Sequence, residues 1–145
     1  MSDGTSDDRI VEMFMFDILI AILKIKKTIE EFNDVQGLVA DYKAWDSVVR
    51  EFEIIGEASK YLLKTNLIDK EYQVVVDFRN KIIHGYFGVE ADIIWYIIHN
   101  ELGDYCQTIL QLIDNIERGL KQELIDSFIE DNRYWDFIVI PLQQL

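Results

Sequence analysis

The chain has 145 residues, half of them hydrophobic, and a formal net charge of −13 from 14 basic and 27 acidic residues. This is the length and composition of one ordinary domain that can bury its own core. The single cysteine, Cys106, excludes an intrachain disulfide framework and suits a reducing compartment. The start of the chain is polar and acidic, unlike a signal peptide, and no apolar run reaches bilayer length, so we expect a cytoplasmic protein without a membrane partner.

The pattern of apolar residues predicts helices along most of the chain. Apolar side chains recur every three or four residues, strand-like alternation is largely absent before Arg133, and the only proline is Pro141. In chain order, the expected helices span 8–32 (capped by Asp7 or Asp8), 38–64, 69–84 (capped by Asp69) and 92–117, with a short one near 121–130. We therefore predict an all-α fold, an antiparallel four- to five-helix bundle.

The sequence predicts a single helical domain over 1–145, with a flexible N-terminus at 1–7. The C-terminal extension, 119–145, is dense in aromatic and β-branched residues after Arg133. Such a segment would be sticky if it were exposed, and Pro141 limits a regular continuation. We expect the extension to pack on the bundle or to contribute to an interface, and the sequence alone does not choose between these.

The most informative segment is 79–86, which reads Arg-Asn-Lys-Ile-Ile-His-Gly-Tyr. Arg79 and His84 are the candidate catalytic residues, because a guanidinium can neutralise phosphate oxygens and an imidazole can move a proton near neutral pH. Asn80, four residues before His84, is a supporting candidate that could hydrogen-bond the imidazole or the phosphate. Tyr86 places a phenol beside this pair.

The spacing of Arg79 and His84 needs a structural explanation. On an ideal helix, positions five apart differ by about 140° in direction, so the two side chains would not face the same way. One solution is that Gly85 ends the helix and lets the last turn open. A second, compatible solution is a two-fold homodimer that brings the arginine of one chain near the histidine of the other. The competing interpretation is a histidine making a dipole contact at a helix end, with Arg79 as a solvated charge and Tyr86 packed structurally.

Three blocks of sequence resemble the HEPN superfamily, and in particular its HepT toxin branch. The segment from Arg79 to Tyr86 is similar to the family's Arg-x4-His-x-Tyr motif, 50–58 is similar to its Arg-x3-Ile-Ile-Gly-Glu-Ala segment, and 87–95 is similar to the stretch after the motif. The resemblance covers about 10–118. Family members often have a tryptophan where this chain has Tyr72, and the extension after Arg118 matches nothing in the family pattern.

The resemblance implies a ribonuclease toxin of a toxin–antitoxin module that cleaves RNA without a metal or cofactor. In this mechanism His84 takes or relays the proton of the attacking 2′-OH and Arg79 stabilises the transition state, so DNA is not a substrate. The resemblance also implies an MntA-like nucleotidyltransferase antitoxin as partner. That antitoxin would transfer AMP from ATP onto Tyr86 and so block the site.

Other chemistries lack their motifs in this sequence. There is no phosphate-binding Gly-rich loop, Cys-x2-Cys pair, His-Glu-x2-His or Glu-x2-His, so no metal site is predicted. Glu53 and Glu57 share a helix face, and with Lys60 nearby we interpret them as a solvated edge.

The net charge of −13 opposes long-range attraction of RNA. A local basic cleft of Arg50, Arg79 and Lys81, doubled in a homodimer, would still accept it. The alternative functions are a non-catalytic helical module that binds a nucleotide or docks a nucleotidyltransferase, and a purely structural helical dimer.

Overall fold

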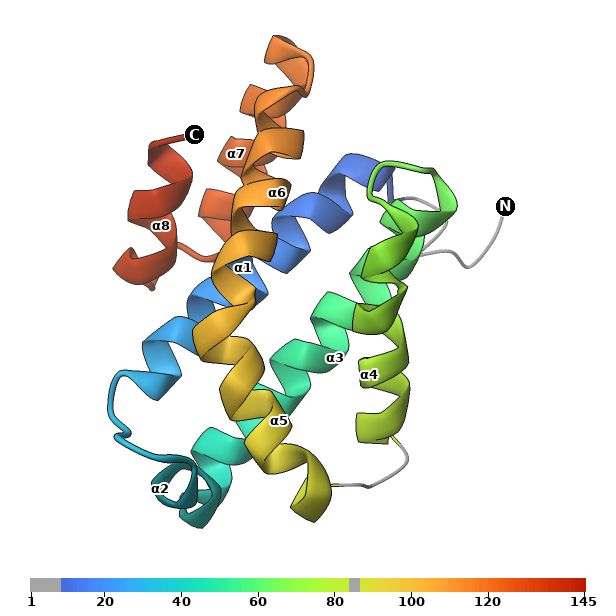
Figure 1. Cartoon of the computed structure of the whole chain (residues 1–145). Coiled ribbons are helices and arrows are strands. Elements are labelled where there is room, and N and C mark those ends of the chain that lie inside the picture. Colours follow the sequence, from blue (N-terminus) through green and yellow to red (C-terminus); the bar gives the residue numbers. More distant parts are fainter. Residues whose placement is uncertain (1–8, 84–86) are drawn as a thin grey trace.

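The computed structural model describes residues 9–83 and 87–145, and it describes the side chains of these residues except those of 82–83 and 87–90. The described part of the chain is helical and contains no strand (Figure 1). Its elements are α1 (Val11–Ile29), α2 (Val35–Ala40), α3 (Tyr42–Lys64), the 3₁₀ turn η1 (Lys70–Tyr72), α4 (Gln73–Ile83), α5 (Phe87–Asn100), α6 (Leu102–Asp114), α7 (Arg118–Asp131) and α8 (Asp136–Gln143). The predicted all-α bundle is confirmed, with more and shorter helices than expected. Five of the residues named above, Asp7, Asp8, His84, Gly85 and Tyr86, and the expected flexible segment 1–7 lie outside the described residues.

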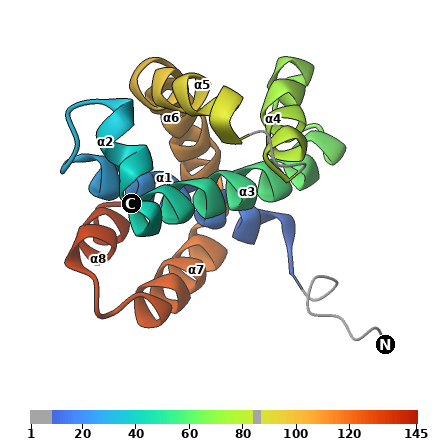
Figure 2. The same ribbon diagram turned by 90° about the horizontal axis from the view of Figure 1, so that it is seen from below.

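The first helix, α1, forms the centre of the core. Phe16, Ile18, Ile22 and Ile25 are all fully buried. The apolar surface of α1 is wider than one stripe because α3, α6 and α8 all pack against it. Figure 2 shows α1 and α3 crossing the middle of the molecule, with α4, α5 and α6 on one side and α7 and α8 on the other.

The helix predicted over 38–64 is wrong in one detail, because the structure divides it at Asp41. The backbone of Asp41 is extended, and its carboxylate accepts a hydrogen bond of 3.1 Å from the N–H of Ala44 at the start of α3. Asp34 caps α2 in the same way, through a 2.8 Å bond from Gly37. A cap residue that satisfies free N–H groups favours a new helix start over continuation of the old one. Asp69, by contrast, begins η1 without a side-chain cap bond.

The helix predicted over 92–117 is also two helices, α5 and α6, which meet at Glu101. The side chains of His99 and Asn100 contact the carbonyl oxygens of Trp95 and Tyr96, at 2.8 and 2.9 Å, on the last turn of α5. The break itself lies at Glu101, whose backbone departs from helical geometry (φ −127°, ψ −30°). In Figure 1, α6 continues upward from the end of α5 but is inclined to it.

The C-terminal extension forms α7 and α8 and packs on α1. The rings of Phe16 and Phe128 stack with their centroids 5.0 Å apart, and Ile138 and Leu142 are fully buried. Pro141 lies inside α8, which ends at Gln143 soon after it. Of the two arrangements that the sequence left open, the structure therefore has the extension packed on the bundle. Within the described residues, no helix is both long and apolar enough to cross a membrane.

Candidate active site

The candidate site is built where α4 lies against α3 at Gly56. A Cβ atom at position 56 would lie 2.7 Å from Cγ of Arg79 and closer still to its Cβ. Only a glycine therefore allows α4 to approach this closely, because any side chain would collide with the stem of Arg79. The contact is reinforced one turn away, where the rings of Phe52 and Phe78 meet edge to face at 5.8 Å.

The close approach brings the guanidinium of Arg79 onto the carboxylate of Glu57. Arg79 Nη2 lies 3.1 Å from Oε1 of Glu57, and Nη1 donates a 3.0 Å hydrogen bond to Oδ1 of Asn80. The Nε atom is buried and has no hydrogen-bond partner among the described residues. The Arg79 side chain as a whole keeps 27% of its surface exposed, although its Nε atom is buried.

The structure places two of the four predicted site residues, Arg79 and Asn80. Asn80 accepts from its neighbour Arg79, a contact that the sequence did not predict. His84 and Tyr86 lie outside the described residues, between the last described residue of α4 and the first of α5. The second histidine, His99, contacts the carbonyl of Trp95 and packs its ring 4.4 Å from the ring of that tryptophan.

Sequence reasoning missed Glu57. The expected pairing with Lys60 is present, with Nζ 3.2 Å from Oε2 of Glu57, but the other carboxylate oxygen holds Arg79. Glu57 is thus a partly solvated residue, 39% exposed, that also contacts the candidate catalytic arginine. The available signal was the Gly56-Glu57 pair, because a glycine within a long amphipathic helix points to a close helix contact at that position.

The predicted basic cleft is not assembled by direct contacts in the described part of the chain. Arg50 is exposed on α3, and Lys81 lines a groove that Arg79 does not line. The charge of Arg79 is itself compensated by Glu57. The contacts of the described residues therefore do not show a basic cleft around Arg79.

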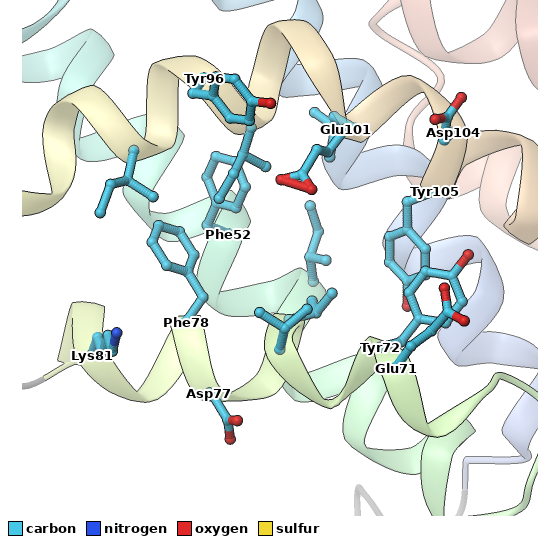
Figure 3. A pocket seen from close by; sticks show the side chains of 16 residues that line it. Phe52, Glu71, Tyr72, Asp77, Phe78, Lys81, Tyr96, Glu101, Asp104 and Tyr105 are labelled. Carbon is cyan, nitrogen blue, oxygen red and sulfur yellow. The ribbon is translucent and has the colours of Figure 1, made fainter.

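A groove of about 620 Å³ lies between α4 and the α5–α6 pair (Figure 3). Its floor is aromatic and aliphatic, and four carboxylates stand around it. The side chains labelled in Figure 3 are Phe52, Glu71, Tyr72, Asp77, Phe78, Lys81, Tyr96, Glu101, Asp104 and Tyr105. Neither Arg79 nor Glu57 lines this groove. It is therefore a surface separate from the Arg79 cluster, on the same helix α4.

Two buried groups near the groove are held in their neutral forms. Burial raises the pKa of Tyr105 to about 12, and its hydroxyl shares a 2.6 Å hydrogen bond with Ser59. Burial also raises the pKa of the Cys106 thiol, so this cysteine is a poor nucleophile near neutral pH. Within the described residues, no three or more His, Cys, Asp or Glu side chains cluster as metal ligands would.

Comparison with known proteins identifies the family. The family model described as "Ribonuclease HepT-like" matches residues 18–113. The chain belongs to the HepT-like ribonuclease family. The match includes all of 79–86 and excludes α7 and α8. The predicted resemblance to HepT is confirmed, and membership makes this chain an enzyme of the ribonuclease class.

Curated HepT-like relatives match over most of their own length. "Putative RNase MJ0127" of Methanocaldococcus jannaschii is 35% identical over 113 residues, which are 74% of this chain and 90% of the relative. "Probable ribonuclease HepT" of Thermococcus cleftensis is 32% identical over 92 residues, 59% of this chain and 84% of the relative. "Putative RNase TTE0752" of Caldanaerobacter subterraneus subsp. tengcongensis is 39% identical over 93 residues, 61% of this chain and 72% of the relative. No solved structure matches the chain.

Proposed function

We propose that this HepT-like chain is the toxin of a toxin–antitoxin module, a metal-independent endoribonuclease whose site is Arg79, His84 and Tyr86 with Asn80 in support. The observation that carries this proposal is the family match, which spans the whole motif segment. The partly exposed side chain of Arg79, held by Glu57, supports it, because a phosphate-cleaving site needs a fixed cation.

The proposed reaction is transesterification within RNA. The 2′-oxygen forms a bond to the adjacent phosphorus while the bond from phosphorus to the 5′-oxygen breaks. His84 takes or relays the proton of the 2′-OH, and a proton is returned to the leaving 5′-oxygen. Arg79 stabilises the extra negative charge on the phosphorane-like transition state. The products are a 2′,3′-cyclic phosphate and a 5′-OH, and DNA, which lacks the 2′-OH, is not cleaved.

The proposed regulator is an MntA-like nucleotidyltransferase antitoxin that modifies Tyr86. The phenolic oxygen would attack the α-phosphorus of ATP, forming an oxygen–phosphorus bond and releasing pyrophosphate. The attached AMP is bulky and anionic, so it would occupy the site and pair with the charge of Arg79 that RNA needs.

We also propose that the toxin acts as a homodimer that meets through the motif helix α4. Support comes from apolar side chains left exposed around the groove, namely Val74 on α4 (64% exposed) and Ile93 and Tyr96 on α5 (42% and 59%). Exposed apolar surface of this kind marks interaction sites. A two-fold contact here would also add the Arg50, Arg79 and Lys81 charges of a second chain.

The testing experiment incubates purified protein with labelled RNA in EDTA and maps the product ends, comparing wild type with Arg79→Ala and His84→Ala. We expect cleavage by wild type alone, with cyclic phosphate ends. Equal activity in all three proteins would reveal a contaminant. If wild type cleaves no RNA and mass spectrometry shows Tyr86 free of AMP, the result would favour the non-catalytic binding module. The net charge of −13 and the acidic rim of the groove also suit that alternative.

A further inference from the structure

The carboxylate of Glu57 forms an ion pair with the candidate catalytic arginine, Arg79. A guanidinium has five N–H donors in one plane, and in Arg79 two of them are engaged, one by Glu57 and one by Asn80. These two partners lie on different helices, α3 and α4. Together they fix both the position and the plane of the guanidinium, whereas either one alone would leave it free to rotate.

The position of Glu57 follows from the residue before it. Gly56 allows the stem of Arg79 to lie directly on α3, so the next side chain of α3 meets the guanidinium at 3.1 Å. Lys60, one turn further along α3, contacts the second oxygen of the same carboxylate at 3.2 Å. The result is a chain of alternating charges, Arg79, Glu57 and Lys60, that holds the carboxylate from both sides.

We propose that Glu57 is a positioning residue that holds the Arg79 guanidinium ready for the RNA phosphate. A free arginine side chain has many rotamers, and those must be restricted before the charge can stabilise a transition state. Glu57 restricts them in the folded protein, before RNA binds. This inference rests on the proposed function, because it assumes that Arg79 acts on the phosphate.

The test measures steady-state RNA cleavage by wild type, Glu57→Gln, Glu57→Asp and a matched control, Glu53→Gln. Glu53 lies one turn earlier on the same face of α3 and forms no ion pair among the described residues. We expect Glu57→Gln to lower kcat about 10- to 100-fold, the scale of a misplaced catalytic group, with KM changed much less. Glu57→Asp keeps the charge and should recover part of the loss, and Glu53→Gln should match wild type.

A second readout follows Arg79 itself. The ¹⁵N NMR signal of its Nε group should shift and broaden in Glu57→Gln, because the side chain gains motion, and should stay unchanged in Glu53→Gln. An unchanged signal would overturn the inference. Circular dichroism melting of each variant provides the structural control, and a loss of activity that only follows a loss of folded protein would also overturn it.

The outcomes separate this inference from the proposed function. If Arg79→Ala cleaves RNA like wild type, the proposed function fails whatever Glu57 does. If Arg79→Ala is inactive but Glu57→Gln equals wild type, only the role of Glu57 is refuted. An increase in cleavage by Glu57→Gln would mean that the carboxylate restrains Arg79 rather than prepares it, which also contradicts the proposal.

Discussion

Charged side chains inside this bundle differ in whether they have a partner. Arg79 has Glu57 and Asn80, and the half-buried Asp17 has Arg9 at 2.8 Å. Glu51 on α3 is 5% exposed and forms no ion pair within 4.0 Å among the described residues. A buried carboxylate without a close cation favours its neutral form. Glu51 is therefore a place where one side chain sets how stability depends on pH.

We predict that Glu51→Gln stabilises the protein at neutral pH. Burial raises the pKa of Glu51 above its ordinary value of 4.5, and the more distant charges of Lys24 and Arg50 only partly offset this. The contribution of Glu51 to stability is then fully present below pH 4.5 and is lost as pH rises through its folded-state pKa. Urea unfolding at pH 7 should show a higher midpoint for Glu51→Gln than for wild type, and the difference should shrink toward pH 4. A difference that grows on acidification would contradict this assignment.

At the scale of helices, the contact between α3 and α4 decides where the candidate site forms. Helix propensity alone would favour alanine over glycine at position 56 by about 1 kcal/mol. The close approach of Arg79 reverses this preference, because the added methyl group has no space. The glycine therefore weakens α3 locally and permits the packing that brings Glu57 to Arg79.

Gly56→Ala should lower the free energy of unfolding by about 1–3 kcal/mol, because α4 must shift away from α3. RNA cleavage should fall as well, since the shift separates Arg79 from Glu57. Gly103→Ala is the matched control, because a Cβ there meets nothing within 4 Å, so it should be neutral or stabilising by up to about 1 kcal/mol. Chemical denaturation of both variants provides the comparison. Equal stability of the two would show that the α3–α4 contact is looser than the structure indicates.

At the scale of the whole molecule, charge and apolar surface act in opposite directions on self-association. A net charge of −13 makes two copies repel each other, whereas the apolar residues around the groove favour a contact that removes them from water. The groove is lined mainly by α4, α5 and α6, and these helices lie on the opposite side of α3 from α7 and α8 (Figure 2). The C-terminal extension thus protects one face of the bundle and leaves the motif-helix face available.

Val74→Asp should convert the proposed homodimer to a monomer, because it places a charge in apolar contact surface at the rim of the groove. Ile140→Asp on α8 is the matched control, since Ile140 is similarly exposed, at 51% against 64%. Light scattering after size-exclusion chromatography measures the mass of each variant. A dimer that survives Val74→Asp but not Ile140→Asp would move the interface to the C-terminal helices.

The sequence by itself determined the helical class, the family and the motif. The spacing of apolar residues is a local property, so the expected helices overlap those observed from α1 to α7. Helix α8 was not predicted, because Pro141 lies inside it. The motif could be read because its residues are close in sequence. The break at Asp41 was also readable in principle, since aspartate is a favoured cap residue.

Only the tertiary structure decided which residues meet across helices. Glu57 and Arg79 are 22 positions apart, and nothing local to either one specifies the other as its partner. Their contact depends on the angle and distance at which α4 crosses α3, which Gly56 sets by the space it leaves. The packing of α8 on α1 was undecided for the same reason. Such contacts depend on the summed fit of several elements, and that fit is a property of the folded chain rather than of any one segment.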